Sequence, residues 1–140
     1  MGYEVEFRSL HGTSTAIGSA GPFTLIADRP ANAGGGGLGF NGGQLLNLAV
    51  GGCVSNDLFR EALKRGVHLD RVVVRVNSDY TGDPATSTDI TYSVELYGRA
   101  QDEQLRDLAA WVDKIAEIPN SIRRGTAVKL TGVTINEPAA

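Results

Sequence analysis

The sequence predicts an α+β fold built from antiparallel sheets. Three strands precede a long helix, two strands follow it, and a second helix and a last strand complete the chain. Because strands come in adjacent runs with short connections, antiparallel pairing is favoured over the regular strand–helix alternation of a parallel sheet. The chain has 140 residues and shows no repeat or internal linker, so we expect a single domain over residues 1–140.

The strands are predicted from alternating apolar and polar residues, or from short β-rich runs that end at turn residues. Tyr3, Val5 and Phe7 alternate with charged residues, which is typical of a strand with one wet face. Pro30 ends the third strand because proline cannot donate to a ladder. The predicted strands cover residues 3–8, 13–18, 23–27, 71–76, 90–96 and 127–135.

A long helix is predicted over residues 42–65, with signals at both ends. Asn41 can cap its first turn, and Gln44 stands three residues later, as in a capping box. Two basic residues followed by Gly66 mark its end. Apolar residues lie on most sides of this helix, so we expect it to need cover all round.

A second, amphipathic helix is predicted over residues 101–117, closed by Pro119. Its apolar residues recur at helical spacing on one face, which predicts burial of that face. They are Leu105, Leu108, Ala109, Val112 and Ile115.

Composition and charge exclude several classes of protein. The net charge is −3, whereas a nucleic-acid binder is normally basic. No run of 18 apolar residues is present, and the N-terminus lacks the apolar core of a signal peptide. The single cysteine excludes an internal disulfide, and His11 and His68 share no metal-like spacing with it. We expect a soluble, cytoplasmic domain without cofactor or metal, and with neither nucleic acid nor membrane as partner.

Gly37, Gly39 and Gly42 spell G-x-G-x-x-G, the pattern of a dinucleotide-binding loop. That function requires a strand directly before the first glycine and an acidic residue at the end of the next strand. Here the nearest strand ends near Asp28, and Glu61 lies inside the long helix, where it cannot reach a ribose. We therefore interpret the segment as a flexible surface loop before a capped helix. An anion could still bind the free N–H groups at that helix start.

Cys53 lies in the middle of the long helix and has two interpretations. A lone cysteine among apolar neighbours is usually a small buried hydrophobe. A reactive thiolate would need a cation or hydrogen-bond donor from elsewhere in the fold, because the helix dipole fades within the first turn. Gly51 and Gly52 each cost the helix about 1 kcal/mol relative to alanine. Two such residues beside the thiol indicate close approach of another backbone or space for a small molecule.

Three segments resemble the OsmC/Ohr family over nearly the whole chain. They are DRP before the glycine-rich loop, GGQLLNLAVGGCVSNDL with its aspartate Asp57, and AEIPNSIRRG. The resemblance implies an intertwined homodimer in which antiparallel sheets surround two long central helices. It also implies reduction of organic and inorganic hydroperoxides. In the family a peroxidatic cysteine becomes a sulfenic acid, a second cysteine condenses with it, and a dithiol restores the pair, while an arginine and a glutamate hold the thiolate.

The resemblance maps Cys53 onto the peroxidatic position. Ile118 stands where the family has its second cysteine, so any turnover would need an external thiol. The glutamate falls on Gln44, or on Gly43 in the Ohr-type spacing, and Gln44 also fits the capping box. Arg8 is near the strand that carries the arginine, although a solvated arginine on a strand face explains it as well.

Two functions therefore stay open. One is a thiol peroxidase for oxidative-stress defence, which acts through Cys53 on a small hydroperoxide with an external thiol or dithiol reductant. The other is a non-catalytic dimer, structural or binding a small molecule, in which Cys53 is inert. The neutral residues Ile118 and Gln44 favour the second, and the family resemblance favours the first.

Overall fold

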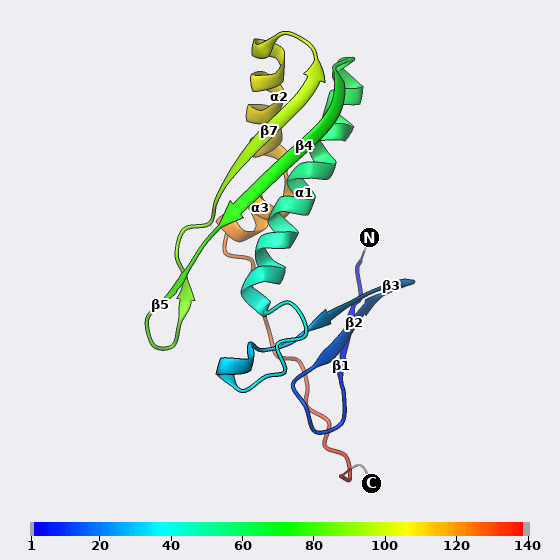
Figure 1. The fold of residues 1–140 in the computed structure, drawn as a ribbon, viewed down its shortest axis with the longest axis vertical. Coiled ribbons are helices and arrows are strands. Elements are labelled where there is room, and N and C mark those ends of the chain that lie inside the picture. The colour runs from blue at the N-terminus through cyan, green and yellow to red at the C-terminus, as the bar shows by residue number, and fades with distance from the viewer. Residues whose placement is uncertain (1, 139–140) are drawn as a thin grey trace. The chain divides into compact units, whose positions relative to one another are not determined.

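The computed structural model describes residues 2–138, and the chain divides into two compact units. The first unit comprises residues 2–45 and 130–138, and the second comprises residues 46–129. Most of the elements are labelled in Figure 1. Helices are combined with antiparallel sheets, which confirms the predicted α+β class. The expectation of one domain over residues 1–140 stays a prediction.

The first unit contains a three-stranded antiparallel sheet in the order β1-β2-β3. The strands are β1 (Glu6–Ser9), β2 (Ala16–Ala20) and β3 (Phe23–Ala27). All three predicted strands are confirmed, but β2 begins three residues later than expected. The reason is the turn before it, where the N–H of Leu10 donates to the carbonyl of Thr15 at 2.8 Å.

The glycine-rich segment after β3 is held by the carboxylate of Asp28 rather than being the flexible loop that the sequence predicts. The hydroxyls of Ser14 and Thr15 donate to this carboxylate at 2.7 and 2.8 Å, and the N–H groups of Arg29 and Leu38 donate at 2.7 and 3.2 Å. These four bonds, the two hydroxyls first, hold the pKa of Asp28 well below its usual range. A short 3₁₀ turn, Ala31–Ala33, lies within the segment.

The glycines meet steric needs of this segment. The chain returns beside β3, where the N–H of Phe40 donates to Ile26 O at 2.9 Å. A side chain at Gly39 would collide with that same backbone oxygen, so only glycine fits. β3 ends ten residues before Gly37, which confirms that the strand–turn–helix context of a dinucleotide loop is missing.

Helix α1 (Gly42–Arg65) has the bounds that the sequence predicts. The capping box is confirmed as well. The N–H of Gln44 donates to Asn41 Oδ1 at 2.9 Å, and the N–H of Asn41 donates to Gln44 Oε1 at 3.0 Å. The two residues thus satisfy backbone donors that the helix start leaves free.

The sheet of the second unit pairs β4 (His68–Asn77) with β7 (Thr91–Arg99). A register shift between Leu69 and Arg71 changes the alternation, so that Leu69 and Val72 both pack against the core although they are three residues apart. A small hairpin, β5 (Tyr80–Thr81) with β6 (Thr86–Ser87), was not predicted because its strands have only two residues each.

Helix α2 (Asp102–Ile115) confirms the predicted amphipathic helix, but Pro119 does not close it. The helix ends at Ile115, and a further helix, α3 (Glu117–Arg123), contains Pro119 in its first turn. Proline is tolerated there because the first turn of a helix has free N–H groups, so no hydrogen bond is lost.

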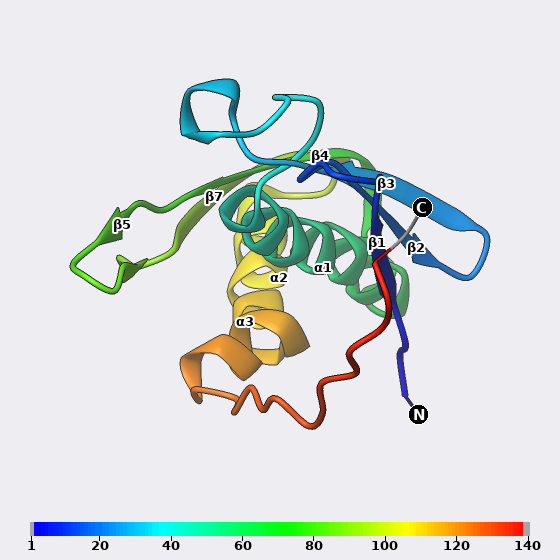
Figure 2. The same cartoon turned by 90° about the horizontal axis from the view of Figure 1, so that it is seen from below.

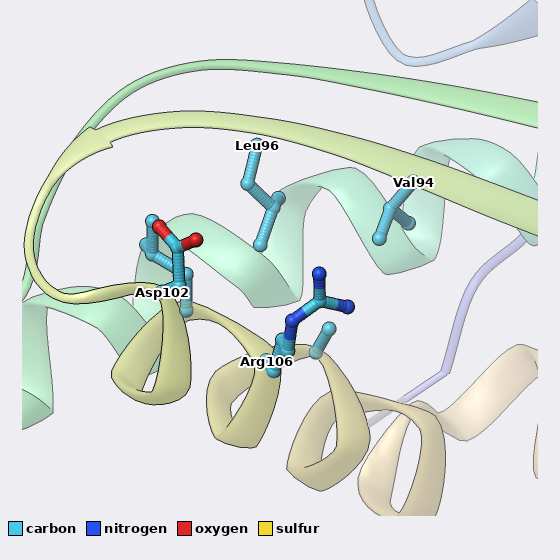
Figure 3. Close-up of a pocket in the computed structure, with 6 residues that line it drawn as sticks. Val94, Leu96, Asp102 and Arg106 are labelled. Carbon is cyan, nitrogen blue, oxygen red and sulfur yellow. The ribbon is translucent and has the colours of Figure 1, made fainter.

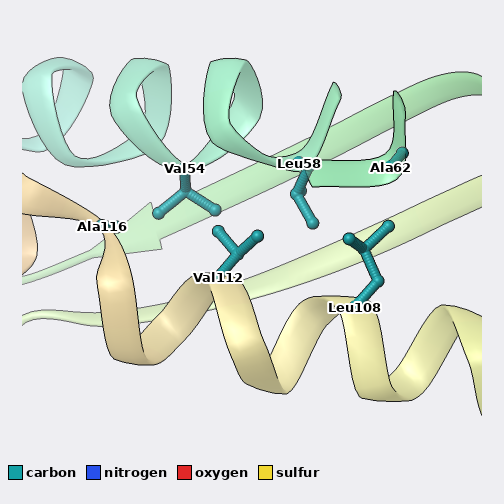
Figure 4. Packing of buried hydrophobic residues seen from close by; sticks show 6 residues of the cluster. All are labelled: Val54, Leu58, Ala62, Leu108, Val112 and Ala116. Carbon is teal, nitrogen blue, oxygen red and sulfur yellow. The ribbon is translucent and has the colours of Figure 1, made fainter. Parts of the chain in front are cut away.

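The core of the second unit lies between α1, α2 and one face of the β4–β7 sheet. Three residues of α1 at four-residue spacing face three residues on or just after α2 with the same spacing (Figure 4). These are Val54, Leu58 and Ala62, with Leu108, Val112 and Ala116, all 0–2% exposed. Figure 2 shows both helices on the same side of β4 and β7.

The predicted last strand over residues 127–135 is wrong for this chain. The segment has no regular secondary structure, and its apolar residues are almost fully exposed. Val128, Leu130, Val133 and Ile135 are 99, 85, 72 and 86% exposed. The alternation is present in the sequence, but a strand forms only where a neighbour accepts its backbone hydrogen bonds.

Among the residues that the structure describes, none of the helices is both long enough and apolar enough to cross a bilayer.

Candidate functional site

Cys53 lies in the middle of α1 and is half-buried. Its side chain packs at the edge of the core cluster that α1 forms with α2. Cys53 is therefore neither fully buried in the core nor fully exposed on the surface.

The thiol of Cys53 contacts the carboxylate of Asp57, one turn along the same helix. The distance from Sγ to Oδ2 is 3.9 Å, which is long for a hydrogen bond but within reach of the large sulfur atom. Asp57 is 8% exposed, and its other oxygen is 3.2 Å from Nη1 of Arg60. Spacings of three and four residues place side chains on one helix face. A thiol, a buried carboxylate and a guanidinium thus follow one another along α1.

A second buried carboxylate follows one turn later. Glu61 is 6% exposed and accepts a hydrogen bond from the indole Nε1 of Trp111 at 2.9 Å. Its other oxygen is 3.0 Å from Nζ of Lys64. The indole first, and then Lys64, lower the pKa of Glu61. Trp111 thus joins α2 to α1.

The two glycines before Cys53 have different surroundings. A Cβ on Gly51 would be 3.2 Å from Cγ2 of Val76, so this glycine lets β4 side chains pack closely on the helix. A Cβ on Gly52 would meet no atom of the described residues within 4 Å outside its own stretch of helix. The close neighbour at Gly51 is thus a side chain and not the backbone that the sequence predicts, whereas the space beside Gly52 is open among the described residues.

The other sequence-predicted site residues belong to the first unit. Gln44 is engaged in the capping box with Asn41, as described above. Arg8 is 3.0 Å from Glu6 in an exposed ion pair, with 80% of its side chain exposed. Both arrangements match the structural explanation that the sequence offered for each residue, and a role of either at Cys53 stays a prediction.

In the sequence Asp57 stands out only as part of the family-like motif, and Arg60 belongs to none of the quoted motifs. The signal was available, because the two residues follow Cys53 by four and seven positions on a predicted helix. What the sequence lacks is the burial of Asp57, which depends on packing against the rest of the second unit.

A cavity of about 450 Å³ lies in the second unit beside the N-terminal part of α1. Its apolar lining includes Leu46, Val50 and Pro119, and Arg123 lies at its polar side. Arg123 is held in an ion pair: its Nη2 is 2.7 Å from Oδ1 of Asp113.

The same Asp113 oxygen accepts a short hydrogen bond from the hydroxyl of Tyr92. Burial, the bond to Asp113 and its charge raise the pKa of Tyr92, so this hydroxyl stays protonated at neutral pH. Together Tyr92, Asp113 and Arg123 hold α3 against α2 and β7.

A second cavity of about 430 Å³ lies between β7 and α2. Figure 3 shows Val94 and Leu96 of β7 on one side, and Asp102 and Arg106 of α2 on the other. Within the described residues 2–138, no three His, Cys, Asp or Glu side chains gather in a way that could hold a metal ion.

Known structures share this fold. An OsmC-like protein from Mycoplasma pneumoniae is 14% identical with a TM-score of 0.76, and the match covers 90% of this chain and 89% of that chain. An organic hydroperoxide resistance protein OsmC from Legionella pneumophila is 17% identical with a TM-score of 0.61, covering 88% and 90%. The organic hydroperoxide resistance protein OhrB of Bacillus subtilis is 17% identical with a TM-score of 0.61, covering 89% and 93%.

No curated protein matches the chain in sequence. The family model described as OsmC-like protein matches residues 34–131, which include the glycine-rich segment, all of α1 and the Cys53 position. This match covers more than half of the chain, and the similar structures carry the same fold. The chain therefore belongs to the OsmC family.

Proposed function

We propose that this protein is a thiol peroxidase that reduces organic hydroperoxides through Cys53 and serves oxidative-stress defence. The observation that carries the proposal is the half-buried thiol of Cys53, placed within the family-matched segment and in contact with Asp57. The Legionella pneumophila and Bacillus subtilis proteins that share the fold are described as organic hydroperoxide resistance proteins, which supports the same chemistry.

In the proposed reaction the sulfur attacks the terminal oxygen of the hydroperoxide. The S–O bond forms as the O–O bond breaks, the sulfur becomes a sulfenic acid, and the peroxide leaves as an alcohol after gaining the thiol proton. Cys53 is the single cysteine of the chain. An external thiol must therefore condense with the sulfenic acid and release water, and a second thiol then restores Cys53.

We also propose that two copies of the chain form the working homodimer. On α1, Leu48 and Leu63 are 52 and 83% exposed, and the apolar residues of 127–135 are exposed as well. Burial of apolar area is worth about 25 cal/mol per Å², so a second copy that covers these surfaces would stabilise the pair. Size-exclusion chromatography with light scattering tests this: a monomer at micromolar concentration contradicts it.

The activity is tested with purified wild-type protein and Cys53→Ser as its control. With tert-butyl hydroperoxide alone, we expect intact-mass spectrometry to find one added oxygen atom, located on Cys53. With dithiothreitol present, we expect the wild type to consume peroxide catalytically and the serine variant to be inactive. A wild-type thiol that stays unmodified, or equal consumption by the serine variant, contradicts the proposal.

A second candidate function is favoured by the cavity beside Val50 and Pro119, whose lining is mainly apolar. A cavity of about 450 Å³ has the size of a small-molecule site. In this alternative the protein holds an apolar ligand and Cys53 is inert. Native mass spectrometry of protein purified from cells, compared with Cys53→Ser, distinguishes the two, because a ligand retained equally by both would favour binding over catalysis.

A further inference from the structure

The carboxylate of Asp57 occupies a position between the reacting sulfur and a cation. Oδ2 is 3.9 Å from Sγ of Cys53, and Oδ1 is 3.2 Å from Nη1 of Arg60. Asp57 is 8% exposed, whereas the side chain of Arg60 is 53% exposed. A buried carboxylate is costly unless a partner stabilises it, and the ion pair with Arg60 provides that partner. Oδ1 of Asp57 is thus paired with Arg60, and Oδ2 is the oxygen that contacts the thiol of Cys53.

Reduction of a hydroperoxide requires a proton to move. The thiol must lose its proton before the sulfur attacks, and the leaving alkoxide must gain one, since a free alkoxide is a poor leaving group. A side chain that accepts the first proton and donates the second serves both steps, and such general acid–base catalysis typically contributes about 10²- to 10⁴-fold. Contacts of this kind are often long before the substrate binds.

Three other polar side chains of α1 are engaged elsewhere or lack a suitable proton. Glu61 is one turn beyond Asp57 and is held by Trp111 and Lys64. Arg60 carries a guanidinium, which donates hydrogen bonds and offers no acceptor for the thiol proton. Gln44, at the position of the family's glutamate, carries an amide and is engaged with Asn41.

We propose that Asp57 is the proton carrier of the reaction, a role that rests on the proposed function of Cys53. Asp57 accepts the proton from Sγ, the thiolate attacks the terminal peroxide oxygen, and the neutral carboxyl donates the proton to the alkoxide as the O–O bond breaks. The sulfur is oxidised by two electrons and the peroxide is reduced by two. Cys53 ends as the sulfenic acid, the product is the alcohol, and Asp57 is again a carboxylate.

The test compares two oxidants that differ in their need for a proton. tert-Butyl hydroperoxide releases a strongly basic alkoxide, whereas peracetic acid releases acetate, which leaves without protonation. Single-turnover rates of Cys53 oxidation are measured with both for the wild type and Asp57→Asn. We expect the variant to react about 100-fold more slowly with tert-butyl hydroperoxide. The loss with peracetic acid should be at least tenfold smaller.

Two further variants sharpen the comparison. Glu61→Gln changes a matched buried carboxylate on the same helix that does not contact the sulfur, and we expect both of its rates within about twofold of wild type. Asp57→Glu keeps an acid and should recover part of the rate with tert-butyl hydroperoxide. Equal losses with both oxidants in Asp57→Asn, or no loss with either, overturn the role of Asp57 while the activity of the wild type stands. A wild type that is inert to both oxidants overturns the proposed function itself.

A measurement on the wild type alone covers the case in which Asp57→Asn fails to fold. If proton donation accompanies O–O cleavage, the rate with tert-butyl hydroperoxide falls more in deuterium oxide than the rate with peracetic acid. Equal isotope effects for the two oxidants overturn the proposal.

Discussion

The indole of Trp111 donates a hydrogen bond to the buried carboxylate of Glu61, joining α2 to α1 at 2.9 Å. The same ring lies under the guanidinium of Arg65, 5.8 Å from its centroid. The Trp111 side chain thus gives the buried carboxylate of Glu61 a hydrogen-bond donor, which offsets part of the free-energy cost of burying it. It also contacts the guanidinium of Arg65 at the end of α1. The pairing of α1 with α2 has a polar link in addition to its apolar core.

Trp111→Phe keeps an aromatic ring and removes the donor to Glu61. We expect the thermal midpoint to fall by a few degrees at neutral pH, because a buried carboxylate loses its main hydrogen bond. The pKa of Glu61 is lowered in the folded protein, so its stabilisation is present above the unfolded value and is lost as pH falls through the folded value. The difference between variant and wild type should therefore close below about pH 4. Thermal unfolding from pH 2 to 8 checks this, and a pH-independent difference would mean that only packing was lost.

With the amide nitrogen at the Oδ2 position, Asp28→Asn removes the acceptor of the Leu38 N–H, while the Thr15 hydroxyl can accept from the NH₂ instead of donating. We expect the amide of Leu38 to exchange with solvent faster. The pKa of Asp28 is strongly lowered, so its contribution to stability is complete above about pH 4 and is lost progressively below it. The free energy of unfolding of Asp28→Asn should not show this decrease as the pH is lowered. Asp107→Asn, at an exposed aspartate, is the control, and an unchanged Leu38 exchange rate in Asp28→Asn would contradict the assignment.

Leu108→Ala opens a cavity in the core between α1 and α2, where Leu108 is 0% exposed. We expect it to lower the free energy of unfolding by about 2–5 kcal/mol. Leu105→Ala is the matched control one turn earlier, where the side chain is half-buried and lines the cavity between β7 and α2, and it should cost less than half as much. Urea unfolding followed by circular dichroism measures both. Equal losses would place the core elsewhere than between Leu58 and Leu108.

Gly52→Ala and Gly51→Ala test whether a second copy covers α1. A methyl at Gly52 meets no described atom outside its own stretch of helix, so in a monomer alanine should stabilise the helix by about 1 kcal/mol. A methyl at Gly51 must displace Val76 and should stabilise less or destabilise. If a second chain packs on Gly52, alanine there should weaken association instead. Sedimentation together with thermal unfolding distinguishes these outcomes, and a stabilised variant with unchanged association would contradict coverage of Gly52.

Local signals in the sequence predicted the elements whose cause is local. The bounds of α1 follow from the capping box of Asn41 and Gln44 and from the stop at Gly66, because caps and breakers act within a few residues. The absence of a predicted strand directly before Gly37 was enough to reject a dinucleotide-binding loop, because that requirement is also local. The prediction that Pro119 ends the second helix was wrong. A proline can follow the end of one helix or lie in the first turn of the next, and the local sequence does not distinguish the two cases.

The long-range features were decided by tertiary structure. Residues 127–135 alternate as a strand should, yet they are not a strand in this chain, because a ladder needs a partner that sequence periodicity does not supply. The carboxylate of Asp28 accepts hydrogen bonds from residues that lie 10 to 14 positions away in the sequence. Burial of Asp57 beside the thiol depends on how α1 packs in the second unit. The sequence by itself determined α1, the amphipathic helix α2, the strands of the first unit and the strands β4 and β7. The place of Asp57 one turn after Cys53 follows from the helix, whereas the burial of Asp57 and the packing of Cys53 at the edge of the core were decided only by tertiary structure, because a side chain's burial is set by the whole unit around it.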